Sequence, residues 1–260
     1  MNQLIKLYKF LIVLVILSSC STQEKIKIAI SKGSGHPSYE NYSKWLKNFH
    51  SNIEMIDLYA MEYEKALEVM NEVDGLVMSG GVDLHPGRFG RAEDASKCEI
   101  DLKRDTLEFA ILEKAINSDI PILGICRGLQ MINVYQEGSL IVDIPSENNS
   151  TLHQTPEPGD AFHDVSVMPD TKLARLTGAE IENVNSNHHQ AIDLLGKNLI
   201  PTSYATDDIV ESIEWQDTTG LPWMLAVQWH PERLDNKKMS ELIALEFLKA
   251  VKVRLGAVKK

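Results

Sequence analysis

The chain has 260 residues, a formal net charge of −11 and 43% hydrophobic residues. This length and hydrophobic content are sufficient to bury the core of one large domain or of two small ones. The acidic balance argues against nucleic acid as a partner, since phosphate binding depends on clustered lysine and arginine.

The start of the chain has the pattern of a secretory signal. Lys6 and Lys9 precede the apolar run FLIVLVIL and the small residues SSC. The run is too short to cross a bilayer, which takes roughly 20 apolar residues. LSSC resembles a bacterial lipobox, and this implies lipidation of Cys20 and attachment to a membrane of the cell envelope; an uncleaved anchor or ordinary signal cleavage is the alternative. We therefore divide the chain into a lipoprotein signal (1–19), a lipidated tether (20–25) and one folded domain (26–255).

The first half of the domain alternates short apolar runs with amphipathic segments. Predicted strands cover 26–31, 53–58, 74–81 and 120–125, and predicted helices cover 39–50, 62–73, 100–118 and 127–136. Strands that alternate with helices indicate a parallel sheet with right-handed crossovers. Because the strands are nearly continuous apolar runs, helices should cover both faces of the sheet.

The second half is different. FHDVSVM, IENVN, SYATD, IVESIEW and WMLAVQW are short segments typical of strands, with turn residues between them. We expect them to extend or flank the sheet, and residues 237–253 to form a closing amphipathic helix. The fold class is therefore α/β.

Cys126 stands between a predicted strand and a predicted helix. The pattern Gly124-Ile-Cys126-Arg-Gly128 matches the G-x-S-x-G nucleophile elbow, with cysteine in place of serine. A turn this sharp leaves no room for side chains beside the nucleophile. The start of a helix also favours a thiolate, which is the reactive form of cysteine. Taken alone, the pattern is also compatible with a buried thiol of the core that takes no part in catalysis.

A base and a group that orients it follow another apolar strand. In AVQWHPERL, His230 stands where α/β folds place their active sites, and Glu232 lies two residues further on. Glu232 can accept a hydrogen bond from one imidazole nitrogen while the other faces the thiol. Backbone N–H groups of Gly81, in SGGVDLHPG, and of Arg127 can form an oxyanion hole.

These motifs resemble a known family. PILGICRGLQ with VQWHPE is similar to class I glutamine amidotransferases, and SGGVDLHPGRFG, DLKRDTLE, VNSNHHQAI and IVESIEW resemble the gamma-glutamyl-gamma-aminobutyrate hydrolase branch, which is peptidase C26-like. The resemblance covers residues 26–234. It implies a three-layer, flavodoxin-like sandwich with a mostly parallel central sheet.

The resemblance also implies roles for individual residues. Cys126 would be the nucleophile, His230 the base and Glu232 its orienting partner. Arg104 would pair with Asp105 behind the elbow, with a solvated helix face as the alternative. The substrate side would be lined by Gln130, Asn185, Ser186, His188, His189 and Gln190. No cofactor is implied, and no His-x3-His or Cys-x2-Cys spacing indicates a metal site. Cys98 and Cys126 could form a disulfide, but two free thiols are expected.

Three functions follow as hypotheses. The first is hydrolysis of small gamma-glutamyl amides through a glutamyl thioester. The second is the glutaminase component of an amidotransferase, which an envelope location disfavours. The third is a lipid-anchored binding protein in which the three residues are catalytically silent. The amine on the leaving side and the oligomeric state are not indicated.

Overall fold

The structure is a computed structural model that describes residues 25–258. The predicted signal and Cys20 lie outside the described residues. The strands are β1 (Ile26–Ile30), β2 (Ile53–Asp57), β3 (Gly75–Met78), β4 (Ile122–Ile125), β5 (Leu140–Ile141), β6 (Ala161–Val167), β7 (Ile181–Ser186), β8 (Ala191–Ile192), β9 (Leu199–Ala205), β10 (Val210–Trp215) and β11 (Met224–Val227). The helices are α1 (Glu40–Phe49), α2 (Tyr63–Val69), α3 (Leu102–Asn117), α4 (Arg127–Tyr135), α5 (Ile144–Asn148), α6 (Lys172–Thr177) and α7 (Leu242–Val258).

One large sheet organises the domain, with strand order β2-β1-β3-β4-β11-β10-β9-β6-β7. The strands from β2 to β11 pair in parallel, and those from β11 to β7 pair antiparallel. The alternating first half of the chain thus forms the parallel part, as predicted. The β-rich second half extends the same sheet, and β5 pairs with β8 in a separate small ribbon.

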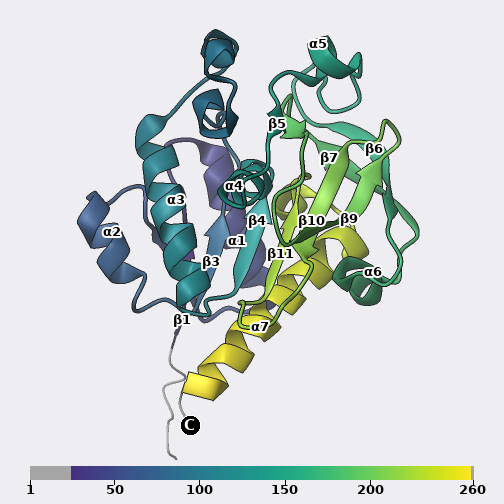
Figure 1. The fold of residues 1–260 in the computed structure, drawn as a ribbon. Coiled ribbons are helices and arrows are strands. Elements are labelled where there is room, and N and C mark those ends of the chain that lie inside the picture. The colour runs from purple at the N-terminus through teal and green to yellow at the C-terminus, as the bar shows by residue number, and fades with distance from the viewer. Residues whose placement is uncertain (1–24, 259–260) are drawn as a thin grey trace, which may run out of the picture.

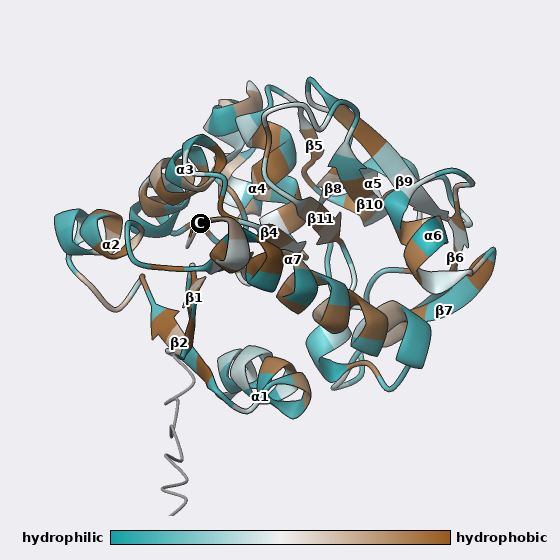
Figure 2. Cartoon of the chain, turned by 90° about the horizontal axis from the view of Figure 1, so that it is seen from below, coloured by the Kyte–Doolittle hydropathy of each residue, from teal (hydrophilic) through white to brown (hydrophobic). Residues whose placement is uncertain are grey.

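Helices cover both faces of the sheet (Figures 1 and 2). One core lies under α1, α6 and α7 and contains Trp45, Leu173 and Phe247. The other lies under α2, α3 and α4 and contains Ala66 and Leu129. Strands β3, β4 and β11 are buried at every position, since side chains of both faces point into a core. The predicted three-layer α/β sandwich with a mostly parallel central sheet is confirmed.

Element boundaries differ little from those predicted in the parallel half. The closing helix begins differently, because Lys237–Glu241 forms a π-helical turn and α7 follows it. Within the described part of the chain, no helix combines the length and the apolar character needed to cross a membrane.

Candidate active site

The candidate site lies at the carboxyl edge of the parallel strands. Strands β3, β4 and β11 are neighbours in the sheet. Ser79-Gly80-Gly81 follows β3, Cys126 follows β4, and His230 comes three residues after β11. Because parallel strands end at the same edge, three segments far apart in the sequence converge there.

Cys126 occupies a strained turn between β4 and α4. Its backbone has φ 52° and ψ −108°, a conformation that residues other than glycine rarely adopt. Glycine is needed on both sides. A Cβ on Gly124 would lie 2.7 Å from Cβ of Ala226, and one on Gly128 would lie 2.1 Å from the carbonyl oxygen of Met78. The turn therefore presents the thiol at the first turn of α4, as the elbow pattern predicted.

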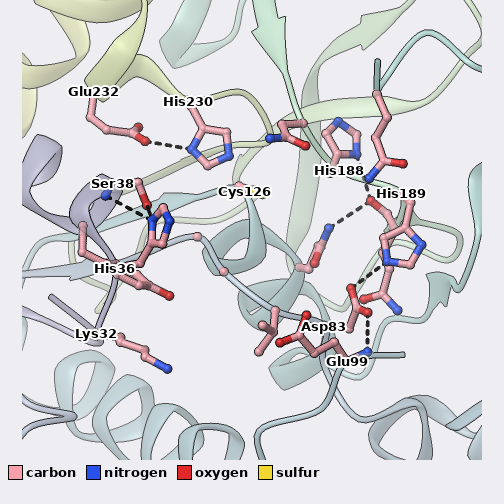
Figure 3. Close-up of a pocket in the computed structure, with 18 of the residues that line it drawn as sticks. Lys32, His36, Ser38, Asp83, Glu99, Cys126, His188, His189, His230 and Glu232 are labelled. Carbon is pink, nitrogen blue, oxygen red and sulfur yellow. Dashed lines mark hydrogen bonds and ion pairs between the residues drawn. The ribbon is translucent and has the colours of Figure 1, made fainter. Parts of the chain in front are cut away.

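His230 and Glu232 form a buried pair beside Cys126 (Figure 3). His230 Nδ1 donates to Glu232 Oε1 at 2.8 Å, and both side chains are nearly inaccessible to solvent. The imidazole also interacts electrostatically with Cys126. A Cβ on Gly80 would lie 2.9 Å from His230 Cε1 and 3.4 Å from Cys126 Cβ, so the glycine packs against both.

The two neighbours of His230 set its charge. Burial favours the neutral ring, but interactions with Glu232 and with Cys126 oppose it and raise the pKa of His230 to about 10. An imidazolium beside a sulfur is the arrangement in which a cysteine reacts as a thiolate.

A second layer of contacts holds this segment. The backbone N–H of His230 donates to Asn185 Oδ1 at 3.2 Å. Asn185 Nδ2 donates to Asp160 at 3.0 Å, and Arg233 binds the same carboxylate through two contacts of 2.7 Å. Asn185 was predicted on the substrate side; the structure places it behind His230, fully buried.

The glycine loop after β3 is oriented by a buried arginine. Arg104 Nη2 donates to the carbonyl oxygens of Ser79 and Gly80, both at 2.8 Å. Since the C=O and N–H of a trans peptide point in opposite directions, the N–H of Gly81 faces away from Arg104. Gly81 has φ 144°, and a Cβ there would lie 2.1 Å from Arg104 Nη1, so only glycine fits.

Four buried charges join α3 to α4 behind the elbow. Arg104 pairs with Glu108 at 2.8 Å, and Arg127 pairs with Asp105 at 2.5 Å and also with Glu108. The predicted pair between Arg104 and Asp105 is wrong. Adjacent helical residues point in different directions, whereas residues four apart share a face.

A cavity of about 860 Å³ opens above Cys126, His230 and Glu232 (Figure 3). Of the predicted substrate-side residues, Gln130, His188, His189 and Gln190 line it. Ser186 and Asn185 are buried outside the lining. Gly35, His36 and Ser38 also line it, and they belong to the segment GSGHPS after β1, which the sequence marks as a loop over the site; Gly80 of the glycine pair after β3 lines it too. The lining residues that the sequence did not single out are Lys32, Tyr39, Tyr42, Val82, Asp83, Lys97, Glu99, Gln154, Asn187 and Arg233.

Three contacts hold the wall opposite Cys126. His189 bonds Asp83 at 2.9 Å and Asp143 at 3.3 Å, and the bond to Asp83 is the main reason that its pKa is raised. Gln130 Nε2 donates to the backbone oxygen of Gln190 at 2.9 Å. The wall is therefore tied to both the loop after β3 and the elbow helix.

Both described cysteines are free thiols. Cys98 lies outside the cavity lining and accepts a contact from Gln190 Nε2 at 3.5 Å. Burial, reinforced by the charge of Asp83, raises the pKa of Cys98 to about 11. Cys98 is thus a protonated, unreactive thiol at neutral pH.

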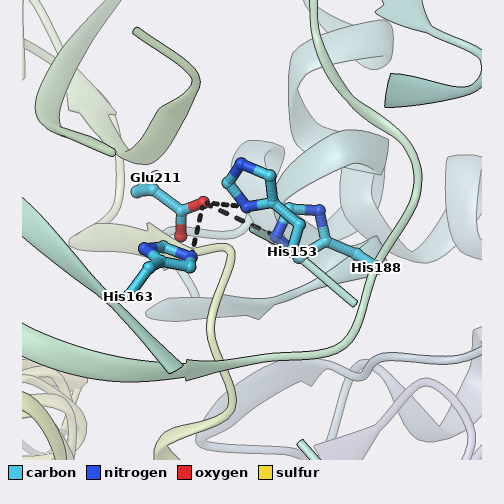
Figure 4. A group of neighbouring side chains, drawn as sticks. All are labelled: His153, His163, His188 and Glu211. Carbon is cyan, nitrogen blue, oxygen red and sulfur yellow. Dashed lines mark ion pairs between the residues drawn. The ribbon is translucent and has the colours of Figure 1, made fainter. Parts of the chain in front are cut away.

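A group of four buried residues adjoins the cavity wall and was not predicted. We call His153, His163, His188 and Glu211 the His–Glu cluster; their potential ligand atoms all lie within 4.8 Å of one another (Figure 4). The four residues are spread over 59 positions, so no short spacing reveals them. One signal was available: His163 alternates with Val165 and Val167 on the buried face of β6.

Comparisons with known proteins agree with this geometry. The family model of Peptidase C26 matches residues 19–232. A Schizosaccharomyces pombe protein, provisionally named a glutamine amidotransferase, is 36% identical over 177 residues, which cover 67% of this chain and 68% of that protein. The gamma-glutamyl-gamma-aminobutyrate hydrolase of Escherichia coli K12 is 31% identical over 174 residues, covering 64% of this chain and 66% of the relative.

Solved structures support the fold alone. The glutaminase domain of Trypanosoma brucei CTPS, with bound acivicin, aligns with a TM-score of 0.61 at 15% identity, covering 88% of this chain and 94% of that domain. Among the curated relatives, the matches span from 54% to 79% of the relatives' own length. The extent of the family match, together with a strained cysteine turn facing a histidine–glutamate pair, shows that this chain belongs to the Peptidase C26 family of glutamine amidotransferase-like hydrolases.

Proposed function

We propose that the chain hydrolyses gamma-glutamyl amide bonds with Cys126 as nucleophile. The thiolate attacks the side-chain carbonyl carbon of the glutamyl group, and the C–N bond breaks as His230 donates a proton to the leaving amine. Water then attacks the thioester, His230 accepts its proton, and glutamate leaves. The N–H groups of Gly81 and Arg127 stabilise the oxyanion in both steps.

The observation that carries this proposal is the juxtaposition at the sheet edge. Cys126, with a backbone φ of 52°, lies beside the buried imidazole of His230. Glu232 Oε1 orients that imidazole by accepting a hydrogen bond from its Nδ1 at 2.8 Å. Glu232 keeps the imidazole charged, so the ring can serve as the acid for the leaving amine. The backbone strain at Cys126 does not stabilise the fold, and strain together with a strongly shifted pKa is expected where a reaction requires them.

The gamma-glutamyl class is supported by the cavity and by one named relative. Asp83 and Glu99 line the cavity together with Lys32 and Lys97, so the lining includes residues of both charges. A glutamyl head carries a free α-ammonium and a free α-carboxylate, and this mixed lining suits both charges. The Escherichia coli relative is named for hydrolysis of such an amide.

The test is turnover of a substrate panel by the purified chain. Gamma-glutamyl-gamma-aminobutyrate, gamma-glutamyl dipeptides and glutamine are compared with the matching α-glutamyl amides. We expect release of glutamate from the gamma-linked compounds only, and a loss of at least about 1,000-fold in kcat for Cys126→Ala. The Cys98→Ala variant, which removes the other described thiol, should retain full activity. Equal turnover by Cys126→Ala would refute the proposal.

The same panel separates the two alternative functions. Preference for glutamine over every other gamma-glutamyl compound would identify a glutaminase. A catalytically silent binding protein would turn over none of them, and its Cys126 would react with iodoacetamide no faster than a small free thiol.

We also propose that Cys20 carries a lipid that anchors the chain in the cell envelope. The proposal rests on the basic start, the apolar run and the lipobox-like LSSC, and it would give the enzyme gamma-glutamyl compounds outside the inner membrane as substrates.

A further inference from the structure

The His–Glu cluster combines three imidazoles and one carboxylate in a buried space next to the cavity, which His188 also lines. The side chains come from a loop (His153), from β6 (His163), from the loop after β7 (His188) and from β10 (Glu211). All are buried, with exposed fractions of 2%, 4%, 5% and 0%. Four convergent ligands from four segments are the composition of a structural metal site.

In each imidazole, one nitrogen faces Glu211 (the inner nitrogen) and the other faces away from it (the outer nitrogen). The hydrogen-bond partner of the outer nitrogen indicates whether that nitrogen carries a proton. His153 Nε2 lies 3.0 Å from Asp207 Oδ2, His188 Nδ1 lies 3.0 Å from the carbonyl oxygen of Gln190, and His163 Nδ1 lies 3.4 Å from that of Asp164. Carboxylate and carbonyl oxygens only accept hydrogen bonds, so each outer nitrogen carries a proton. In the neutral ring, the inner nitrogen then carries the lone pair that a metal ion can bind.

The three inner nitrogens converge on one oxygen. His153 Nδ1 lies 3.3 Å from Glu211 Oε1, and His163 Nε2 and His188 Nε2 each lie 3.5 Å from it (Figure 4). These nitrogens and both Glu211 oxygens have no hydrogen-bond partner among the described residues. Buried polar atoms are normally paired, and lone pairs that face a carboxylate repel one another unless a cation lies between them.

We propose that the His–Glu cluster binds a divalent transition metal ion, Zn²⁺ being the one that fits best. Ligands on a tetrahedral zinc with bonds of about 2.0–2.1 Å lie about 3.4 Å apart. The three separations from Glu211 Oε1 are close to this value, and all the potential ligand atoms lie within 4.8 Å of one another. Imidazole nitrogen suits zinc and is a poor ligand for magnesium or calcium. The outer contacts to Asp207, Gln190 and Asp164 are the second shell that fixes the orientation of metal-binding histidines.

The metal is assigned a structural role rather than a place in the reaction. All four positions of the tetrahedron are filled by protein, so no ligand site is left for substrate. The ion ties β6 and β10 to the segment from His188 to Gln190, which forms the cavity wall. This assignment is independent of the proposed function, because it holds whether or not Cys126 is catalytic.

The test is metal content and coordination in the full chain, purified without a polyhistidine tag. Apo protein is prepared with a chelator, reloaded at micromolar free Zn²⁺ and desalted. We expect about one zinc per chain in the wild type, and its loss in His163→Ala and in Glu211→Gln. Cys126→Ser and His50→Ala, which leave the cluster intact, should retain it; dependence of retention on Cys126 would instead identify a thiol site and overturn the proposal.

Cobalt substitution keeps the test decisive if a cluster variant does not fold. Wild-type protein loaded with Co²⁺ should show the intense visible bands of a four-coordinate ion without thiolate-to-cobalt charge transfer, and chelation should lower its Tm. A wild-type chain that retains no zinc, or whose Tm is unchanged by zinc and by chelator, would overturn the proposal. It would show that hydrogen bonds from protonated imidazoles to Glu211 hold the cluster together without a metal.

Discussion

At the scale of single residues, the backbone is strained at Cys126, the proposed nucleophile. Cys126 has φ 52° and ψ −108° at the turn between β4 and α4. Such a backbone costs about 1–3 kcal/mol when it carries a side chain. The thiol is thereby held in place at the expense of stability.

This strain can be measured by comparing two inactive variants. Cys126→Gly should be more stable than Cys126→Ala by about 1 kcal/mol, since glycine adopts this conformation freely and the gain exceeds its extra unfolded-state entropy. Urea unfolding gives both values. Cys98, with an ordinary φ of −116°, is the matched control, where glycine should be the less stable replacement. The same order at both positions would contradict the assignment of strain.

The charge of His230 predicts the alkaline limit of activity. Its pKa is raised to about 10 from an ordinary value of 6.5, despite the opposing effect of burial. The stabilisation that this charge gives is complete below pH 6.5 and is lost as the pH rises through about 10. The acid needed for the leaving amine is lost over the same range.

We therefore expect kcat/KM to fall on the alkaline side near pH 10. In Glu232→Gln the fall should move to lower pH, because Glu232 is the main group that raises the pKa of His230. A pH–rate profile of both proteins is the measurement. An alkaline limb at the same pH in both would show that Glu232 does not set the charge of His230.

At the scale of elements, the elbow helix approaches the sheet more closely than any side chain would permit. Gly128 lies against the carbonyl of Met78 on β3, and this backbone oxygen cannot turn aside. Close approach at this point places the first turn of α4 under Cys126.

A pair of glycine-to-alanine changes isolates this contact. Gly128→Ala should destabilise the domain by at least about 1–3 kcal/mol, the usual range for overpacking. Gly256→Ala, in α7 with nothing within 4 Å of the added Cβ, should stabilise it by up to about 1 kcal/mol. Thermal unfolding compares the two, and a neutral Gly128→Ala would mean that α4 can move away from β3 without loss.

Two ion pairs with the same i,i+4 helical spacing are predicted to contribute differently to the free energy of unfolding. Glu108 on α3 is fully buried between Arg104 and Arg127, whereas Glu40 pairs with Lys44 in solvent on α1. Glu108→Gln should cost about 3–5 kcal/mol, since two buried guanidinium groups lose their shared carboxylate. Glu40→Gln should leave the unfolding free energy nearly unchanged. A small effect for Glu108→Gln would show that Asp105 alone balances both arginines.

At the scale of the whole molecule, the parallel half of the sheet follows directly from the sequence. Strands covered on both faces are continuous apolar runs, so they and the helices between them are recognisable, and their ends place Cys126 and His230 at one edge. The antiparallel strand order was not predictable, because register and pairing are not encoded in local spacing. For the same reason, the partners of Arg104 and the convergence of the His–Glu cluster emerged only in three dimensions.

The lipid anchor is tested on the whole molecule in a bacterial host. The chain with Cys20 should sediment with membranes, and Cys20→Ala should move it to the soluble fraction or leave it uncleaved. Cys98→Ala is the control for loss of a cysteine elsewhere. An unchanged distribution and an unchanged mass of the mature protein would argue against lipidation.

The parallel and the antiparallel parts of the sheet support different parts of the candidate site, and this has an evolutionary consequence. Cys126 and His230 depend on neighbouring parallel strands, while the wall with His189 is carried by the antiparallel extension. Under the proposed function, mutations of the wall around His189 can therefore alter which amine is accepted, provided that Asn185 on β7, which holds the backbone of His230, is kept. A lineage with this topology can drift from one substrate to another through active intermediates, and a mutant library confined to the wall is the natural starting point for retracing that path.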